Sequence, residues 1–174
     1  MSANKQRGAS LPEFALTLSL FLLVVFGIME LALTYFVWNR VSEAARDGAR
    51  LLIVNAPVGD LSAQSCAAAS PPVVTVACGS ADGSAAGCAP LLSTLWATAP
   101  FITAANVSVQ YRCAATGNPT AQDADRVRTV TLTVSNVAHP QVITALAGLG
   151  WRSGGLLPAV SVTRTSEDLY TKGP

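Results

Sequence analysis

Hydrophobic residues follow one another almost without interruption near the start of the chain. The segment from Phe14 to Trp38 holds a single charged side chain, Glu30. As a helix it is about 37 Å long, enough to cross the roughly 30 Å hydrocarbon core of a bilayer. A core helix of a soluble domain would instead carry polar residues along one face at the helical period. The pattern therefore predicts a membrane-spanning helix.

The residues on either side of this segment predict its orientation. Tyr35 and Trp38 lie at its far end, and such amphipathic rings favour the membrane–water interface. Lys5 and Arg7 are the only charges ahead of Ala9. The positive-inside rule then places the N-terminus in the cytoplasm and the chain after Arg40 on the other side. A cleaved secretory signal would have a shorter apolar run and a small-x-small cleavage site, so we expect this segment to remain as an anchor.

The helical pattern continues beyond the apolar run, over residues 37–52. Opposite charges stand three residues apart at positions 40/43, 43/46 and 47/50. Apolar or small residues share one face: Val37, Val41, Ala44, Gly48 and Leu51. Ala44 and Gly48 form a small-xxx-small pair that permits close helix packing, either on the chain's own domain or on another subunit. The sequence NAPVGD at 55–60 ends the helix.

Alternating apolar and polar residues predict strands in the rest of the chain. The expected strands are 72–77, 106–112, 127–137 and 158–165, with a short helix at 89–98. Residues 79–89 are expected to form a loop, and the Gly-rich segment 139–157 a connection with a helical turn. The predicted fold class is α+β, with a small antiparallel sheet packed against helix.

Four cysteines lie in this second part of the chain: Cys66, Cys78, Cys88 and Cys113. An even number outside the cytoplasm indicates two disulfides, with three possible connectivities among which the sequence does not choose. The spacings contain no CxxC, which argues against a zinc site or a thioredoxin-like redox site.

Composition and motifs exclude several function classes. The net charge of +1 gives no electrostatic basis for binding nucleic acid, and 51% hydrophobic residues exclude a disordered chain. There is no G-x-S-x-G, Walker A or HExxH motif. We interpret His139 as a structural or exposed residue, and Asp123 and Asp125 as solvated loop residues. We therefore expect no enzyme activity, no catalytic residue, no cofactor and no metal site.

Glu13 opens the apolar helix, where a carboxylate is costly unless something offsets it. One explanation is helix electrostatics, since an acid in the first turn favours the positive end of the dipole and Pro12 suits the first helical position. The second explanation counts from Gly8. Cleavage after Gly8 would make Ala9 the new N-terminus, and its ammonium could pair with Glu13 on a neighbouring helix.

These residues carry a family resemblance. Gly8 with an acid at the fifth position after it resembles the class III signal of type IV pilins. The stretch from Arg7 to Arg50 resembles the TadE-like family of tight-adherence (Flp-type) pilus systems. The shared motifs are RGA…EFAL at the start of this stretch, FGIME at 26–30 and AARDGAR at 44–50.

The resemblance implies a minor pilin or pseudopilin that acts in pilus assembly and adherence. A prepilin peptidase would cut between Gly8 and Ala9, and Glu13 would be needed for processing or assembly. Glu30 lies about 24 Å along the helix from Phe14, and it either packs against a partner helix or is partly hydrated near the interface. The implied partners are the peptidase, other pilins and pilus assembly proteins, and the lipid bilayer, with no nucleic acid.

The implied organisation has three parts: a leader at 1–8, a transmembrane and extended pilin-like helix at 9–54, and an α+β domain at 55–174. The protein would be a single-pass protein of the bacterial inner membrane. Its C-terminal domain would be periplasmic, or at the cell surface or in the pilus after assembly. The alternative is an unprocessed, membrane-anchored periplasmic binding or sensor module, which would keep residues 1–8 and need neither Gly8 nor Glu13.

Overall fold

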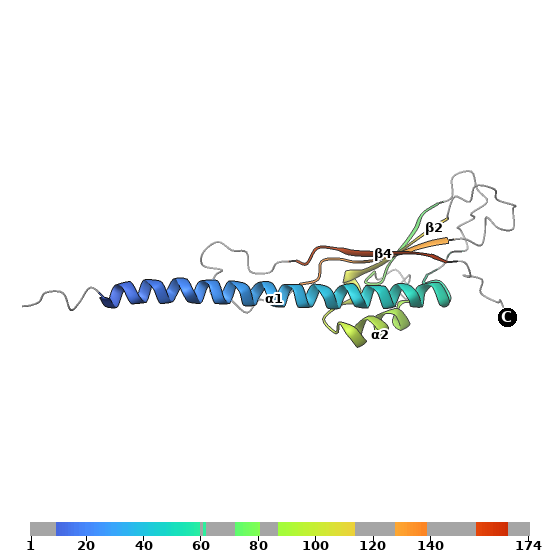
Figure 1. Ribbon diagram of the computed structural model, residues 1–174. Coiled ribbons are helices and arrows are strands. Elements are labelled where there is room, and N and C mark those ends of the chain that lie inside the picture. Colours follow the sequence, from blue (N-terminus) through green and yellow to red (C-terminus); the bar gives the residue numbers. More distant parts are fainter. Residues whose placement is uncertain are drawn as a thin grey trace, which may run out of the picture. The chain divides into compact units, whose positions relative to one another are not determined.

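A single long helix dominates the first third of the protein (Figure 1). The computed structural model describes residues 10–59, 61, 72–80, 87–113, 128–138 and 156–166. Helix α1, Ser10–Val54, runs for 45 residues, or about 67 Å at 1.5 Å per residue. The chain divides into two compact units, and the division falls within α1, between Val37 and Trp38. The first unit contains α1 up to Val37, and the second contains the remaining described elements.

The second unit is built on a four-stranded antiparallel sheet in the order β1-β2-β3-β4. Its elements are β1 (Val74–Ala77), α2 (Ala89–Thr98), the 3₁₀ helix η2 (Ala104–Asn106), β2 (Val107–Cys113), β3 (Arg128–Val134) and β4 (Val160–Ser166). Strands β1 and β3 lie within the segments predicted from alternation, β2 and β4 each extend one residue beyond theirs, and α2 has the predicted bounds. The α+β class is thus confirmed, while most of the expected connection at 139–157 falls outside the described residues.

Alternation in the strands divides the sheet into an apolar face and a hydroxyl-rich face. Val109 on β2 pairs with Leu132 on β3, and both are fully buried. The intervening residues of β3 are partly exposed threonines, and the Thr131 and Thr163 hydroxyls form a 3.0 Å hydrogen bond across β3 and β4. Each fully buried Val or Leu contributes about 1.5–3 kcal/mol relative to an exposed one, so the apolar face holds the domain together.

Helices α1 and α2 supply the rest of this core. Leu91 and Leu95 of α2 are fully buried. From the part of α1 in this unit, the buried side is formed by small and branched residues: Val41, Ala44, Ala45, Gly48, Ala49 and Leu52. The domain half of α1 is therefore an integral part of the domain.

The prediction of the buried face is wrong at one position. The sequence pattern predicts a buried Leu51, but this residue is only partly buried, and Leu52 is fully buried in its place. The buried row runs through Val41, Ala45, Gly48 and Leu52, with steps of four, three and four residues. Since a helix has 3.6 residues per turn, the step after Gly48 must be four to stay on this face.

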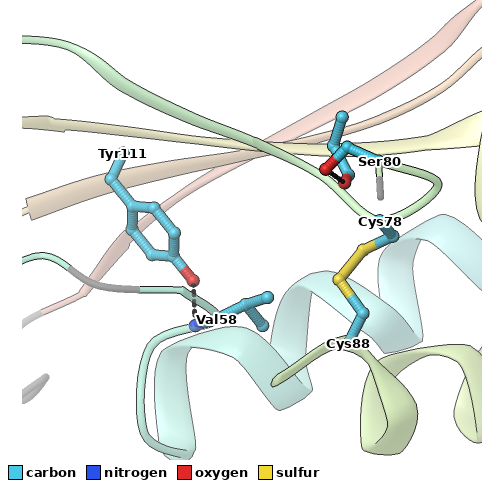
Figure 2. The surroundings of a disulfide bond; sticks show 6 residues. Val58, Cys78, Ser80, Cys88 and Tyr111 are labelled. Atoms are coloured by element: carbon cyan, nitrogen blue, oxygen red, sulfur yellow. Dashed lines mark hydrogen bonds between the residues drawn. A yellow bond between two sulfur atoms is a disulfide. The ribbon is translucent and has the colours of Figure 1, made fainter. Parts of the chain in front are cut away.

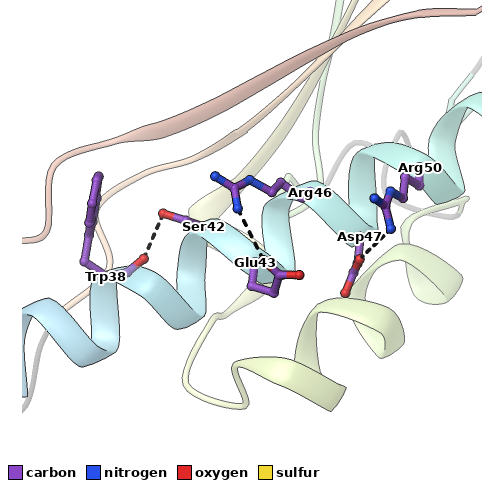
Figure 3. Close-up of polar contacts among 6 residues, drawn as sticks. All are labelled: Trp38, Ser42, Glu43, Arg46, Asp47 and Arg50. Carbon is purple, nitrogen blue, oxygen red and sulfur yellow. Dashed lines mark hydrogen bonds and ion pairs between the residues drawn. The ribbon is translucent and has the colours of Figure 1, made fainter.

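The solvent side of the same helical stretch carries its charges (Figure 3). Glu43 pairs with Arg46 at 3.4 Å, and Asp47 pairs with Arg50 at 3.8 Å, as the spacing predicts. These side chains are largely exposed, so the pairs add little to stability. Arg40 donates from Nη1 to the carbonyl oxygen of Thr98, at 3.3 Å, and so links α1 to the end of α2.

Candidate functional site

The apolar part of α1 carries the residues for which the sequence predicts a function. Among the described residues, α1 is the one helix that is long and apolar enough to cross a membrane. The most apolar 18 residues of α1 include no buried residue. By length and composition, α1 fits a single-pass membrane protein.

Glu13 lies in the first turn of α1 and is exposed. A carboxylate at this position interacts favourably with the positive end of the helix dipole. The Thr17 hydroxyl donates to the carbonyl oxygens of Glu13, at 3.0 Å, and Phe14, at 2.9 Å. The first turn of the helix can therefore accommodate a carboxylate. The predicted processing site, Gly8 and Ala9, lies outside the described residues.

Glu30 lies about 25 Å further along the helix axis than Glu13, at 1.5 Å per residue. Its side chain is partly buried, and its carbonyl oxygen accepts a 2.9 Å hydrogen bond from the Thr34 hydroxyl. Gly27 lies one turn before Glu30 on the same side of the helix. No atom of the described residues lies within 4 Å of a Cβ built on Gly27, and Gly27, like Glu30, is partly buried.

Hydroxyl side chains in the apolar stretch bond to their own helix. Ser19 donates to the carbonyl oxygen of Leu16 at 2.9 Å, in the same way as Thr17 and Thr34. A hydroxyl that bonds to the preceding turn satisfies its own polar atom, which lowers its cost in hydrocarbon. These polar residues are therefore compatible with a membrane span, a point that the sequence alone did not make.

Ala44 and Gly48 lie in the core of the domain. Ala44 is fully buried. A Cβ built on Gly48 would lie 2.9 Å from Leu132, 3.0 Å from Leu91 and 3.1 Å from Leu95, measured to their terminal methyl carbons. The small-xxx-small pair thus lets α1 approach its own sheet and α2. The sequence allowed this pair to pack on the chain's own domain or on another subunit, and in the structure Gly48 packs on the chain's own domain.

A disulfide joins Cys78, just after β1, to Cys88, just before α2, with 5.7 Å between the Cα atoms (Figure 2). Two hydrogen bonds lie beside the disulfide: the Cys78 amide donates to the Val107 carbonyl oxygen at 3.0 Å, and the exposed Ser80 hydroxyl donates to the Ala77 carbonyl oxygen at 2.9 Å. Cys113 is disulfide-bonded as well, whereas Cys66 falls outside the described residues. The structure thus pairs Cys78 with Cys88, whereas the cysteine spacing left three connectivities open.

Sequence reasoning missed the role of Tyr111. Its hydroxyl accepts a buried hydrogen bond of 2.8 Å from the backbone amide of Val58, in the loop after α1 (Figure 2). The bond fastens the end of the long helix to β2, at the turn where Gly59 adopts a positive φ of 81°. The alternation of Val107, Val109 and Tyr111 could have indicated that the ring is buried, but not which group its hydroxyl meets.

The described residues contain no group of three or more His, Cys, Asp or Glu that could hold a metal ion. Three residues considered for chemistry in the sequence, His139, Asp123 and Asp125, lie outside the described ranges. The absence of enzyme activity therefore stays a prediction.

These features define a class of protein: a small disulfide-bonded α+β domain on one long apolar helix that fits a membrane anchor. Residues 8–50 match the family model for TadE-like protein, which confirms the resemblance over the segment that carries its motifs. The match associates the chain with tight-adherence pili, and it covers the apolar helix and its extension. No curated protein and no solved structure gave a significant match.

Proposed function

We propose that this protein is a minor pilin or pseudopilin of a tight-adherence pilus, and that it acts in pilus assembly and adherence. The observation that carries the proposal is the TadE-like match over residues 8–50. The match overlaps one unbroken helix, α1, in which Glu13 precedes the apolar stretch and Glu30 lies within it.

Processing would occur between Gly8 and Ala9, by a prepilin peptidase on the cytoplasmic side of the inner membrane. The new ammonium of Ala9 would then pair with Glu13 of a neighbouring subunit. A carboxylate at the start of a membrane helix is costly unless something offsets it, so an ionic partner for Glu13 favours assembly. Residues 1–8 would be absent from the mature protein.

The side of α1 that carries Gly27 and Glu30 would contact another helix of the pilus or of its basal complex. Small residues allow helix backbones to approach closely in a membrane, and polar residues add interhelical hydrogen bonds. The spacing of Gly27 and Glu30, three residues apart on one side of α1, supports this assignment. Ala44 and Gly48 do not serve the same contact, because they are occupied by the chain's own core.

The domain at 55–174 would lie in the periplasm, or on the cell surface once the subunit is assembled. Its disulfide chemistry supports an oxidising compartment, since disulfides persist there and are rare in the cytoplasm. The protein would have no catalytic role: its partners would be the prepilin peptidase, other pilins and assembly proteins, and the bilayer.

The proposal is tested by Glu13→Ala and by Glu13→Gln, which keeps the size of the side chain and removes its charge. Both variants should insert into the membrane like the wild type but should assemble far fewer pili, because the partner for the Ala9 ammonium is lost. The measurements are membrane fractionation and a count of surface pili. Glu43→Ala is the matched control: it removes an exposed acid of the same helix that pairs with Arg46 at the surface, and it should leave pili unchanged. Normal pili in both Glu13 variants would contradict the proposal.

A further inference from the structure

The cysteines of the domain leave one partner within the chain for Cys113. The sequence has four cysteines, and none of those among the described residues is free. Cys78 is bonded to Cys88, and Cys113 is disulfide-bonded as well. Since a cysteine forms one disulfide, neither Cys78 nor Cys88 can also bond to Cys113. The cysteine that remains is Cys66.

A bond between Cys66 and Cys113 would enclose the bond between Cys78 and Cys88 along the sequence. We call the two the outer and the inner disulfide. The inner disulfide joins residues ten positions apart. The outer one would close a much longer segment, which contains β1, α2 and nearly all of β2. The two bonds therefore constrain different parts of the domain.

The cysteines also differ in burial. Cys78 is 4% exposed and Cys88 1%, at the point where the turn after β1 meets the start of α2 (Figure 2). Cys113 is partly exposed and is the last residue of β2. On one side it pairs with Arg128, the first residue of β3. On the other side β1 begins opposite Tyr111 and does not extend as far as Cys113.

We infer that Cys66 and Cys113 form the outer disulfide, and that this bond is the site at which a thiol–disulfide oxidoreductase exchanges with the folded domain. Exchange requires a thiolate to approach one sulfur atom of the bond, so its rate depends on access to that atom. The burial of Cys78 and Cys88 prevents this approach while the domain is folded. The place of Cys113 at the end of the sheet permits it.

The exchange is a two-electron reaction with a dithiol protein. One thiolate of the reduced oxidoreductase attacks a sulfur of the outer disulfide, whose S–S bond breaks as a mixed disulfide forms. The other cysteine leaves as a thiolate and takes up a proton. The second thiolate of the oxidoreductase then attacks the mixed disulfide, which leaves the domain with two thiols and the oxidoreductase with a disulfide. The reverse reaction, with an oxidised oxidoreductase, forms the outer disulfide.

The pairing is tested with the full-length variant Cys66→Ser, purified in detergent and treated with N-ethylmaleimide in urea without a reductant. Trypsin separates residues 51–112, which hold the first three cysteine positions, from residues 113–126, which begin with Cys113. The label should appear only in peptide 113–126, because the variant leaves Cys113 without its partner. A label in peptide 51–112 would overturn the pairing, since Cys66 would then be bonded to Cys78 or Cys88.

The matched control is Cys88→Ser, which removes one cysteine of the inner disulfide. It should place the label in peptide 51–112, on Cys78, and leave peptide 113–126 unlabelled. The two variants thus give opposite peptide patterns.

Access is tested on the wild-type chain in detergent, with reduced thioredoxin as the dithiol protein and dithiothreitol as a small dithiol. Thiols that form are blocked at intervals and located in the same peptides. The outer disulfide should be reduced at least about tenfold faster than the inner one, because the inner one must wait for local opening of the domain. The first labels should therefore fall on Cys113 and Cys66 together.

A repeat in urea separates burial from intrinsic reactivity. Unfolding exposes all four cysteines, so dithiothreitol should then reduce the two bonds at similar rates. Equal rates in the folded chain, or earlier reduction of Cys78 and Cys88, would overturn the assignment of the exchange site. A preference for the outer bond that persists in urea would also overturn it, since burial would not be its cause.

Discussion

Gly48 illustrates how a single residue, through the absence of a side chain, decides the packing of the long helix. Glycine inside a helix costs about 1 kcal/mol relative to alanine, so its presence needs a compensating gain. The gain is the close approach of Leu91, Leu95 and Leu132, whose methyl carbons stand where a side chain would begin. Gly27, on the same helix, has no described atom within 4 Å of that position. The two glycines therefore have different roles.

This contrast gives a prediction for the matched variants Gly48→Ile and Gly27→Ile. Gly48→Ile overfills the core and should lower the free energy of unfolding of the domain by about 1–3 kcal/mol or more. Gly27→Ile should leave domain stability unchanged, since it adds its atoms to the apolar stretch. The measurement is urea unfolding of both full chains in detergent, followed by near-ultraviolet circular dichroism. Equal stability of the two variants would contradict the packing described for Gly48.

At the scale of elements, the spacing of apolar residues along the chain determined which strands and helices could be predicted. Strands β2, β3 and β4 were predictable because an apolar residue stands at alternate positions, as at Val130, Leu132 and Val134. Helix α2 was predictable because Leu91, Leu92 and Leu95 recur at helical spacing. Both patterns are local, and local patterns are what a sequence displays directly.

Features that depend on contacts between distant segments could not be predicted. Nothing in the cysteine spacings pairs Cys78 with Cys88, because the pairing depends on the turn after β1 meeting the start of α2. The sequence also left open whether Ala44 and Gly48 pack on their own domain or on another subunit. The bond between Tyr111 and Val58 joins residues 53 positions apart, and no periodic signal links them.

The disulfide between Cys78 and Cys88 gives a prediction at the same scale. It joins residues ten positions apart and fixes the start of α2 to the end of β1. The double variant Cys78→Ser, Cys88→Ser should lose about 2–4 kcal/mol of stability, because the unfolded chain regains the freedom that the bond removes. Thermal unfolding of the oxidised proteins measures the loss. Ser80→Ala, which removes a nearby exposed hydroxyl, is the control and should unfold like the wild type; a double variant as stable as that control would contradict the prediction.

At the scale of the whole molecule, α1 belongs to both units. Its part up to Val37 fits a membrane span, and its remaining residues form part of the domain core. An unbroken helix has no Gly/Ser-type linker between these parts, so the anchor and the domain core share one run of helical hydrogen bonds.

The central claim is that the protein is processed and assembled as a pilin-like subunit, and residues 1–8 test it most directly. The measurement is the N-terminal mass of the protein purified from membranes of its native host, beside the Gly8→Ala variant from the same cells. The account predicts a wild-type chain that begins at Ala9 and a variant that largely retains Met1 to its position 8, because the peptidase no longer finds its glycine. A wild-type chain that still begins at Met1, in cells with an active prepilin peptidase, would contradict the account and favour an unprocessed anchored module.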